Sequence, residues 1–146
     1  MRRCAAAILC LLALSACSRQ EHSTPGGCLT DDEAVLRALE RAPGKVALEG
    51  TPLSACLSDT TDGDALQSVG AAYLAAATEL ADSAAVEPEG RAALQLGYLL
   101  GAVKRSEAGA QGVGYELGRR LRAEAARMPG GSRAFARGRR AGAEGG

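Results

Sequence analysis

The sequence predicts an all-α protein, a small bundle of four to five alanine-rich helices with one extended connector. Three observations support this prediction. Apolar residues recur at three- and four-residue steps in several segments, as on one face of an α-helix. Alanine supplies much of the 47% apolar content of the 146 residues, whereas aromatic residues make up 3% and tryptophan is absent. Proline and glycine are grouped where the helical patterns end, which is typical of helix termini.

The first predicted helix covers residues 31–42. It follows the sequence TDDE, in which the hydroxyl of Thr30 can accept a hydrogen bond from a helix amide while Glu33 reaches back, as in a capping box. Pro43 and Gly44 end the pattern. Residues 45–58 (KVALEGTPLSACLS) lack a helical stripe, so we expect an extended connector with a short strand pair there.

The second predicted helix begins at Thr61–Asp64 and has the most regular amphipathic pattern in the chain. A third helix is expected at Pro88, a residue suited to the first turn. Its segment Ala92–Val103 is apolar nearly all round. This segment predicts the central, buried helix of the bundle, because a membrane span takes about 20 apolar residues.

A fourth helix is expected over residues 111–127, ended by Pro129. Residues 132–146 either form a short helix capped by Ser132 or stay loose. Glycines stand four residues apart in two of the predicted helices: Gly97 with Gly101, and Gly114 with Gly118. We expect them on helix faces where neighbouring backbones approach closely.

Two ten-residue segments, ALQLGYLLGA and AFARGRRAGA, share alanine and glycine at four matching positions. Composition explains this similarity more readily than an internal repeat does.

The first seventeen residues have the layout of an export signal. Two arginines follow Met1, and an apolar run extends from Cys4 to Leu14. The run is too short for a permanent membrane span. The sequence LSAC that ends it, Leu14 to Cys17, resembles the lipobox of bacterial lipoproteins, in which an aliphatic residue and two small residues precede an obligatory cysteine. The alternatives are an ordinary exported protein with a cysteine near its cleavage site, or an uncleaved anchor.

The resemblance implies that the chain is cut before Cys17 and that the Cys17 thiol carries a diacylglyceryl group, often with a further acyl chain such as palmitate on the new amino terminus. Two acyl chains hold a domain firmly on a membrane. The expected organisation is therefore a signal peptide (1–16), a lipidated tether (17–29), a helical domain (30–128) and a basic Gly/Ala/Arg tail (129–146). We expect the protein on the extracytoplasmic face of a bacterial cell membrane or on the outer membrane.

Export also bears on the remaining cysteines. With Cys4 and Cys10 removed and Cys17 lipidated, Cys28 and Cys56 remain in an oxidising compartment, where we expect them to form a disulfide. The bridge would stabilise the fold by about 3 to 4 kcal/mol on a chain-entropy argument. A zinc or redox pair is the weaker alternative, since the sequence contains no CxxC motif and His22, the one histidine, lies in the tether.

Charge is distributed unevenly. Residues 17–103 carry five basic and thirteen acidic side chains, whereas residues 104–146 carry ten basic and four acidic ones. We expect Arg133, Arg137, Arg139 and Arg140 to contact an anionic lipid or a cell-wall polymer. The alternative is that the arginines pair with acidic helices of the same domain. Nucleic acid is not an expected partner, because few aromatic residues are present to stack on bases.

Catalytic, metal and cofactor sites are not expected. DTTDGD (Asp59–Asp64) clusters three carboxylates but departs from the EF-hand pattern. GVGYELG (Gly112–Gly118) has the wrong spacing for a dinucleotide fingerprint and no preceding strand. The chain lacks GxSxG. A thin, alanine-rich core also makes a large apolar pocket unexpected.

The function expected from the sequence is a non-enzymatic binding or structural role for a membrane-tethered lipoprotein of the cell envelope. The first alternative is an inhibitor or accessory subunit that binds a partner protein. The second is a hydrolase acting on the cell wall.

Overall fold

α4 (Arg91–Ser106) is the centre of the protein. In the computed structural model, which describes residues 23–107 and 113–146, ten residues of α4 are buried. The helix contacts α6, α3, α2, α5 and α1. The apolar segment Ala92–Val103 therefore forms the buried central helix that its pattern predicts.

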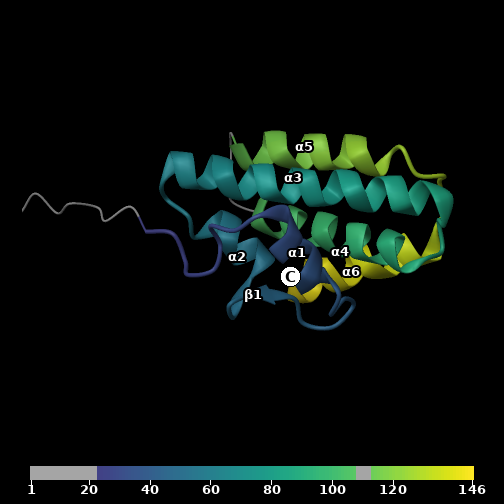
Figure 1. Cartoon of the computed structure of the whole chain (residues 1–146), viewed down its shortest axis with the longest axis horizontal. Helices are drawn as coiled ribbons and strands as arrows, with labels where there is room; N and C mark the ends of the chain where they lie inside the picture. Colours follow the sequence, from purple (N-terminus) through teal and green to yellow (C-terminus); the bar gives the residue numbers. More distant parts are fainter. Residues whose placement is uncertain (1–22, 108–112) are drawn as a thin grey trace, which may run out of the picture.

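The helices are arranged around α4 in two groups. Figure 1 shows α3 (Gly63–Val86) and α5 (Val113–Ala125) side by side along one edge, and α6 (Arg133–Gly145) along the opposite edge. The first part of the described chain, with α1 (Asp32–Leu39), packs against α3 and α4. The protein is mostly helical, as the sequence predicts, and the described residues contain one small two-stranded sheet.

α1 begins one residue later than a cap at Thr30 would place it. The carboxylate of Asp31 accepts a hydrogen bond from the amide of Ala34 at 2.8 Å, so Asp31 is the N-cap. Asp32 and Glu33 then lie in the first turn, where negative charge interacts favourably with the helix dipole. The predicted N-cap at Thr30 is therefore wrong. Aspartate is as good an N-cap as threonine, and here the adjacent Asp31 takes that position.

The predicted strand pair is present. β1 (Ala47–Leu48) and β2 (Thr51–Pro52) are antiparallel. Glu49 and Gly50 connect them with φ angles of 47° and 91°, the left-handed conformation that a two-residue hairpin turn requires.

The predicted extended connector over residues 45–58 is wrong in its second half. Residues Leu53–Ser58 form a short helix, α2. Leu53, Cys56 and Leu57 are buried at helical spacing, and this burial outweighs the weak helical pattern of so short a segment.

Of the next two helix starts, one agrees with the prediction and one differs. α3 is capped by Asp62, whose carboxylate accepts from the amide of Ala65 at 2.7 Å, as the TDGD sequence suggests. α4, however, begins at Arg91 with Gly90 as its N-cap, so Pro88 lies in the turn before the helix and not in its first turn. The amide of Gly90 donates to the carbonyl of Glu87 at 2.9 Å and closes that turn.

α5 and α6 complete the bundle. Leu117 and Leu121 lie one helical turn apart on α5, and both are buried. Residues 111 and 112 of the predicted helix lie outside the described residues. In α6 the Ser132 hydroxyl accepts from the amide of Phe135 at 3.0 Å, so the capped-helix alternative is the correct one. α6, which lies in the predicted basic tail (129–146), packs along α4.

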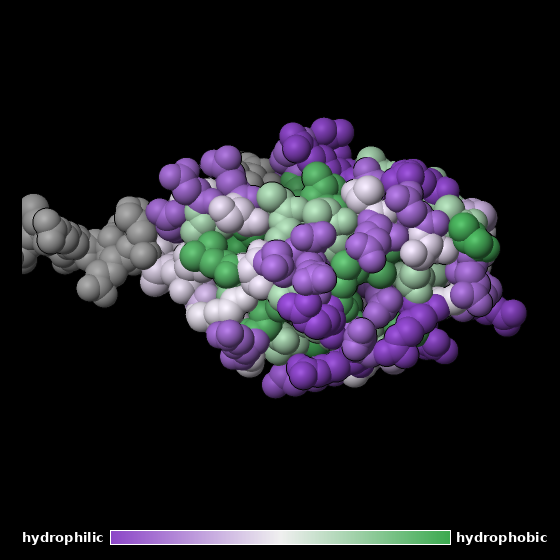
Figure 2. Space-filling model, viewed as in Figure 1, coloured by the Kyte–Doolittle hydropathy of each residue, from purple (hydrophilic) through white to green (hydrophobic). Residues whose placement is uncertain are grey.

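The surface is mixed in character. Figure 2 shows polar and apolar residues interspersed over one face of the molecule. Three large hydrophobic side chains among the described residues are exposed: Leu29, Val86 and Tyr115. They belong to three different parts of the chain.

Candidate functional site

The chain enters the domain beside the start of α3. Cys17, the predicted lipidation residue, lies outside the described residues. The amide of Ser23 donates to the hydroxyl of Thr61 at 3.2 Å, and the carbonyl of Ser23 accepts from the amide of Thr61 at 3.2 Å and from its hydroxyl at 3.5 Å. Thr51 donates to the carbonyl of Gly26 at 3.2 Å. The second half of the predicted tether is thus held on the domain.

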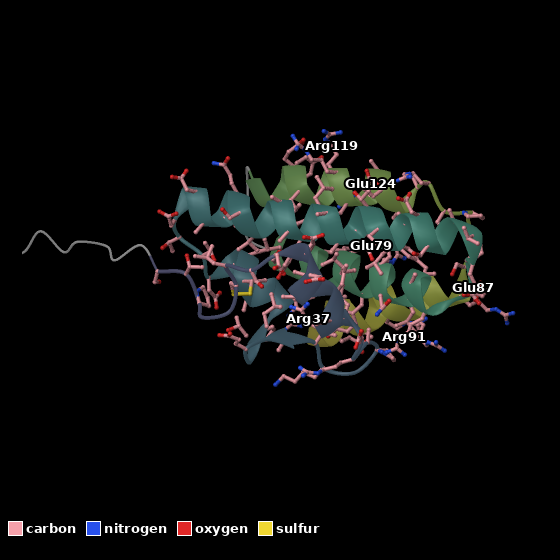
Figure 3. All side chains as sticks on the ribbon, viewed as in Figure 1. Arg37, Glu79, Glu87, Arg91, Arg119 and Glu124 are labelled. Atoms are coloured by element: carbon pink, nitrogen blue, oxygen red, sulfur yellow. A yellow bond between two sulfur atoms is a disulfide. The ribbon has the colours of Figure 1, made fainter. Side chains whose placement is uncertain are left out.

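The predicted disulfide is confirmed in its geometry. The Sγ atoms of Cys28 and Cys56 lie 2.00 Å apart, and both residues are fully buried. The bond joins the entering chain to α2 (visible in Figure 3). α2 in turn contacts α4, so the disulfide ties the amino-terminal segment to the centre of the bundle.

The arginines of α5 and its end pair with carboxylates. Arg119 and Arg120 both bind Glu116, with N–O distances of 2.7 and 2.9 Å. These hydrogen bonds lower the pKa of Glu116 to about 2. Arg119 lies on the outer edge of α5 (Figure 3). Both pairs lie within α5 itself, so they are not pairs between arginines and the acidic helices of the amino-terminal part of the domain.

Two longer-range ion pairs connect α5 to its neighbours. Arg122 binds Glu107, just beyond α4, at 3.3 Å. Arg127 binds Asp82 of α3 as well as Glu124. The pairs are exposed, so each contributes little to stability. They nevertheless neutralise the positive charge of this helix.

The arginines of α6 behave differently. The four predicted contact residues are all exposed, and none forms an ion pair with another described residue: Arg133, Arg137, Arg139 and Arg140. Positive charge that is not neutralised locally is therefore concentrated on α6, within the part of the chain that the structure describes.

The start of α6 is bound by a carboxylate from the α3–α4 turn. Glu89 accepts hydrogen bonds from the backbone amides of Arg133 at 2.9 Å and Ala134 at 3.2 Å. Ser132 also donates to the carbonyl of Pro88 at 2.6 Å. The bond from the Arg133 amide is the main cause that lowers the pKa of Glu89. The helix N-terminus is thus already occupied by an internal anion.

The other end of α6 is also fixed. The guanidinium of Arg105 donates to the carbonyls of Ala143 at 3.2 Å and Glu144 at 2.9 Å. These are carbonyls of the last helical turn, which have no partner within the helix. The hydroxyl of Ser54 in α2 donates to the carbonyl of Gly146. Both ends of α6 are therefore attached to the bundle by polar contacts.

Between its ends, α6 lies directly on α4. A Cβ atom added to Gly97 or Gly101 would overlap the α6 backbone, and one added to Gly138 or Gly142 would overlap the α4 backbone. The close approach predicted for Gly97 and Gly101 is confirmed. Gly118 has no such backbone contact, because a Cβ added there would meet the side chain of Glu107.

The similarity of ALQLGYLLGA and AFARGRRAGA has a structural counterpart. Gly97 packs against the carbonyl of Phe135, and Gly138 packs against the carbonyl of Leu94. Leu94 and Phe135 are the second residues of the two segments, so the two contacts are equivalent. Helices can pack this closely because glycine has no side chain to separate them. The matching glycines therefore serve one shared interface, a role that composition alone did not indicate.

Buried polar groups in the core have partners. The Tyr98 hydroxyl accepts from the amide of Val46 at 3.3 Å, and the Tyr73 hydroxyl donates to the carbonyl of Leu53 at 2.9 Å. Burial raises the pKa of Tyr73. Among the described residues no buried side-chain nitrogen or oxygen lacks a hydrogen bond, and no three His, Cys, Asp or Glu side chains are grouped as a metal site would require. These tyrosines serve the packing of α2 and the hairpin on the bundle.

A slot of about 630 Å³ lies between α5 and α6. Its floor includes Leu100 of α4, and Ala125 and Phe135 line its walls. The connection Met128–Gly131 lines it as well, and because that connection joins the two helices, it closes one end. Alanine and glycine along the walls leave this surface hollow unfilled, although a large apolar pocket is not expected from the sequence. Phe135, the one phenylalanine of the chain, was the available signal for this site.

A second hollow, of about 620 Å³, lies between α3 and α5 near Leu74 and Leu117. Both Glu116 and Arg120 line it, and they pair with each other at 2.9 Å. Its charged groups are therefore already satisfied.

The described residues include no helix with the length and hydropathy of a membrane span. Comparison with protein-family models, with characterised proteins and with solved structures found no match.

Proposed function

We propose that this protein is a lipid-anchored protein of the bacterial cell envelope with a non-enzymatic binding or structural role. The buried Cys28–Cys56 disulfide is the observation that carries the proposal, because disulfides persist in oxidising compartments outside the cytoplasm. It accompanies the lipobox-like sequence that ends at Cys17. Cys17 is the anchor, and the helical domain is the part that binds.

The exposed arginines of α6 support a contact with anionic lipid headgroups or a cell-wall polymer. Arg133, Arg137 and Arg140 are spaced by four and three residues, so they lie on one side of the helix. Each cation near an anionic membrane surface adds about 1 kcal/mol of binding. A domain tethered close to the bilayer brings these side chains within reach of such a surface.

An inhibitor or accessory subunit that binds a partner protein is the second candidate. It is favoured by the slot between α5 and α6, which is open to solvent and partly apolar. Co-purification of one specific protein after crosslinking would favour this function. A hydrolase remains the third candidate, and turnover that is lost on a single carboxylate substitution would favour it.

The anchor is tested by metabolic labelling with a radioactive fatty acid. We expect label in the wild type and none in Cys17→Ser, while Cys10→Ser, which changes a cysteine of the predicted signal peptide, keeps the label. Fractionation of the same cells should place the labelled protein in the membrane. Label that persists in Cys17→Ser would overturn the anchor. Non-reducing mass spectrometry should give a linked Cys28–Cys56 peptide, and free thiols would overturn the exported state.

A further inference from the structure

The slot between α5 and α6 has an apolar interior. Leu100, Ala125 and Phe135 are only partly buried, although each packs against the hydrophobic core. All three line this slot. The volume of about 630 Å³ is within the range of small-molecule sites in proteins, about 300 to 1,000 Å³. The slot thus brings together three of the apolar residues that the fold leaves partly uncovered.

Positive charge lies at the open end of the slot. Arg122 on α5 and Arg139 on α6 line it, and on each helix this arginine is the lining residue farthest along the chain from the connection Met128–Gly131. Arg122 is partly neutralised by Glu107, at 3.3 Å. Arg139 has no ion pair with a described residue. Arg133 lines the slot beside the connection and also has no ion pair, but its charge acts on Glu89, whose pKa it helps to lower. Arg139 is therefore the arginine of the open end whose charge is not neutralised.

We propose that this slot binds a single-chain anionic amphiphile, such as a fatty acid. The apolar chain lies along Leu100, Ala125 and Phe135 towards the closed end, and the anionic head binds Arg139 and Arg122 at the open end. Arginine forms paired, charge-assisted hydrogen bonds with a carboxylate or a phosphate. The proposal goes beyond the anchoring function, and it does not depend on lipidation of Cys17.

The shape of the slot favours an acyl chain over a partner helix. An α-helix with its side chains is about 10–12 Å wide. The residues of α6 that line the slot, from Ser132 to Arg139, extend about 10 Å at 1.5 Å per residue. A helix lying there would need both ends open, whereas the connection Met128–Gly131 closes one end. A narrow chain that ends inside the slot does not have this difficulty.

The test uses the full-length protein, purified and placed in phosphatidylcholine vesicles, with dodecanoate carrying a photoreactive diazirine as the probe. After illumination, mass spectrometry identifies the labelled peptides. We expect labelling of the peptides that contain Leu100, Ala125 and Phe135. Unlabelled dodecanoate should compete, whereas dodecyltrimethylammonium, which has the same chain and a positive head, should not.

Two variants test the head and the chain separately. Arg139→Gln should raise the concentration for half-maximal labelling about tenfold, the effect of losing one charge-assisted hydrogen bond. Arg140→Gln is the matched control, because Arg140 is an exposed arginine of the same helix that does not line the slot. Ala136→Leu fills part of the slot and should reduce labelling while the thermal unfolding of the protein stays unchanged.

Three results would overturn the proposal. One is labelling centred on exposed residues outside the slot, such as Leu29 and Val86. Another is equal competition by the cationic and anionic amphiphiles, which would indicate nonspecific partition. The third is crosslinking of a partner protein in the slot that dodecanoate does not displace. The labelling of Cys17 is measured separately, so failure of the anchor and failure of the slot are distinguishable.

Discussion

Gly97 of α4 and Gly138 of α6 occupy equivalent positions on two parallel helices. A Cβ on Gly97 would overlap the carbonyl of Phe135, and a Cβ on Gly138 would overlap the carbonyl of Leu94. One turn further, Gly142 meets the carbonyl of Tyr98, so contacts advance in the same direction along both helices. The absence of side chains at these positions is therefore what allows α6, with few large apolar residues, to dock on the core.

Substitution of either glycine should separate the two helices. Gly97→Ala and Gly138→Ala should each lower the free energy of unfolding by about 1 to 3 kcal/mol, because a backbone cannot yield as a flexible side chain does. The double variant should cost less than the sum, since the first methyl group already opens the interface. Urea denaturation measures these changes.

Gly63→Ala is the control for this prediction. Gly63 is the first residue of α3, and a Cβ there meets nothing within 4 Å. Alanine should leave the stability unchanged or raise it by up to about 1 kcal/mol, because it favours the helix. A Gly97→Ala protein as stable as the Gly63→Ala protein would contradict the close contact.

Tyr98→Phe should destabilise the attachment of the hairpin. The hydroxyl of Tyr98 accepts a hydrogen bond from the buried amide of Val46 at 3.3 Å. Removal of the hydroxyl leaves that amide without this partner. We expect a loss of about 1 to 3 kcal/mol in the free energy of unfolding. Amide hydrogen exchange at Val46 should become faster. Tyr115→Phe is the control, because Tyr115 is 61% exposed and should tolerate the change without loss.

Removal of the disulfide should weaken the whole domain. Cys28 and Cys56 are separated by 28 positions in sequence. Closing a loop of that length restricts the unfolded chain, so the paired substitution of both cysteines by alanine should lower the free energy of unfolding by about 3 to 4 kcal/mol. Urea denaturation of wild type with and without a reductant provides the matched comparison. Equal midpoints in the two conditions would show that the bridge does not stabilise the fold.

Much of the helical architecture could be predicted from sequence because it depends on local patterns. The apolar stretch of α4, the stripe of α3 and the cap at Ser132 are each visible within a few turns of helix. The disulfide was expected from the predicted export signal and the small number of remaining cysteines. The exact start of α1 could not be predicted, since Thr30 and Asp31 are adjacent and either residue type can cap a helix; the N-cap is Asp31.

The position of α6 could not be predicted in the same way. Its buried residues are Ala134, Gly138 and Gly142, which contribute little apolar area and give a weak hydropathy signal. Its docking depends on contact between backbones and on Glu89, which lies far away in sequence. The slot beside Phe135 likewise results from small side chains on two helices that meet only in the folded state.

Glu89→Gln should remove the contribution that the contact between Glu89 and the start of α6 makes to the pH dependence of stability. The folded protein holds the pKa of Glu89 below its ordinary value, chiefly through the hydrogen bond from the Arg133 amide. A lowered pKa contributes stability above the ordinary carboxyl pKa of about 4.3, and this contribution is lost as the pH falls through the lower, folded value. Wild type should therefore be more stable than Glu89→Gln at neutral pH, and the difference should shrink in acid.

Urea denaturation over a pH series measures this difference in stability. Glu79→Gln, a substitution at an exposed position on α3, is the control. A difference between wild type and Glu89→Gln that stays constant down to the lowest pH would show that the carboxylate does not bind the helix start as an anion.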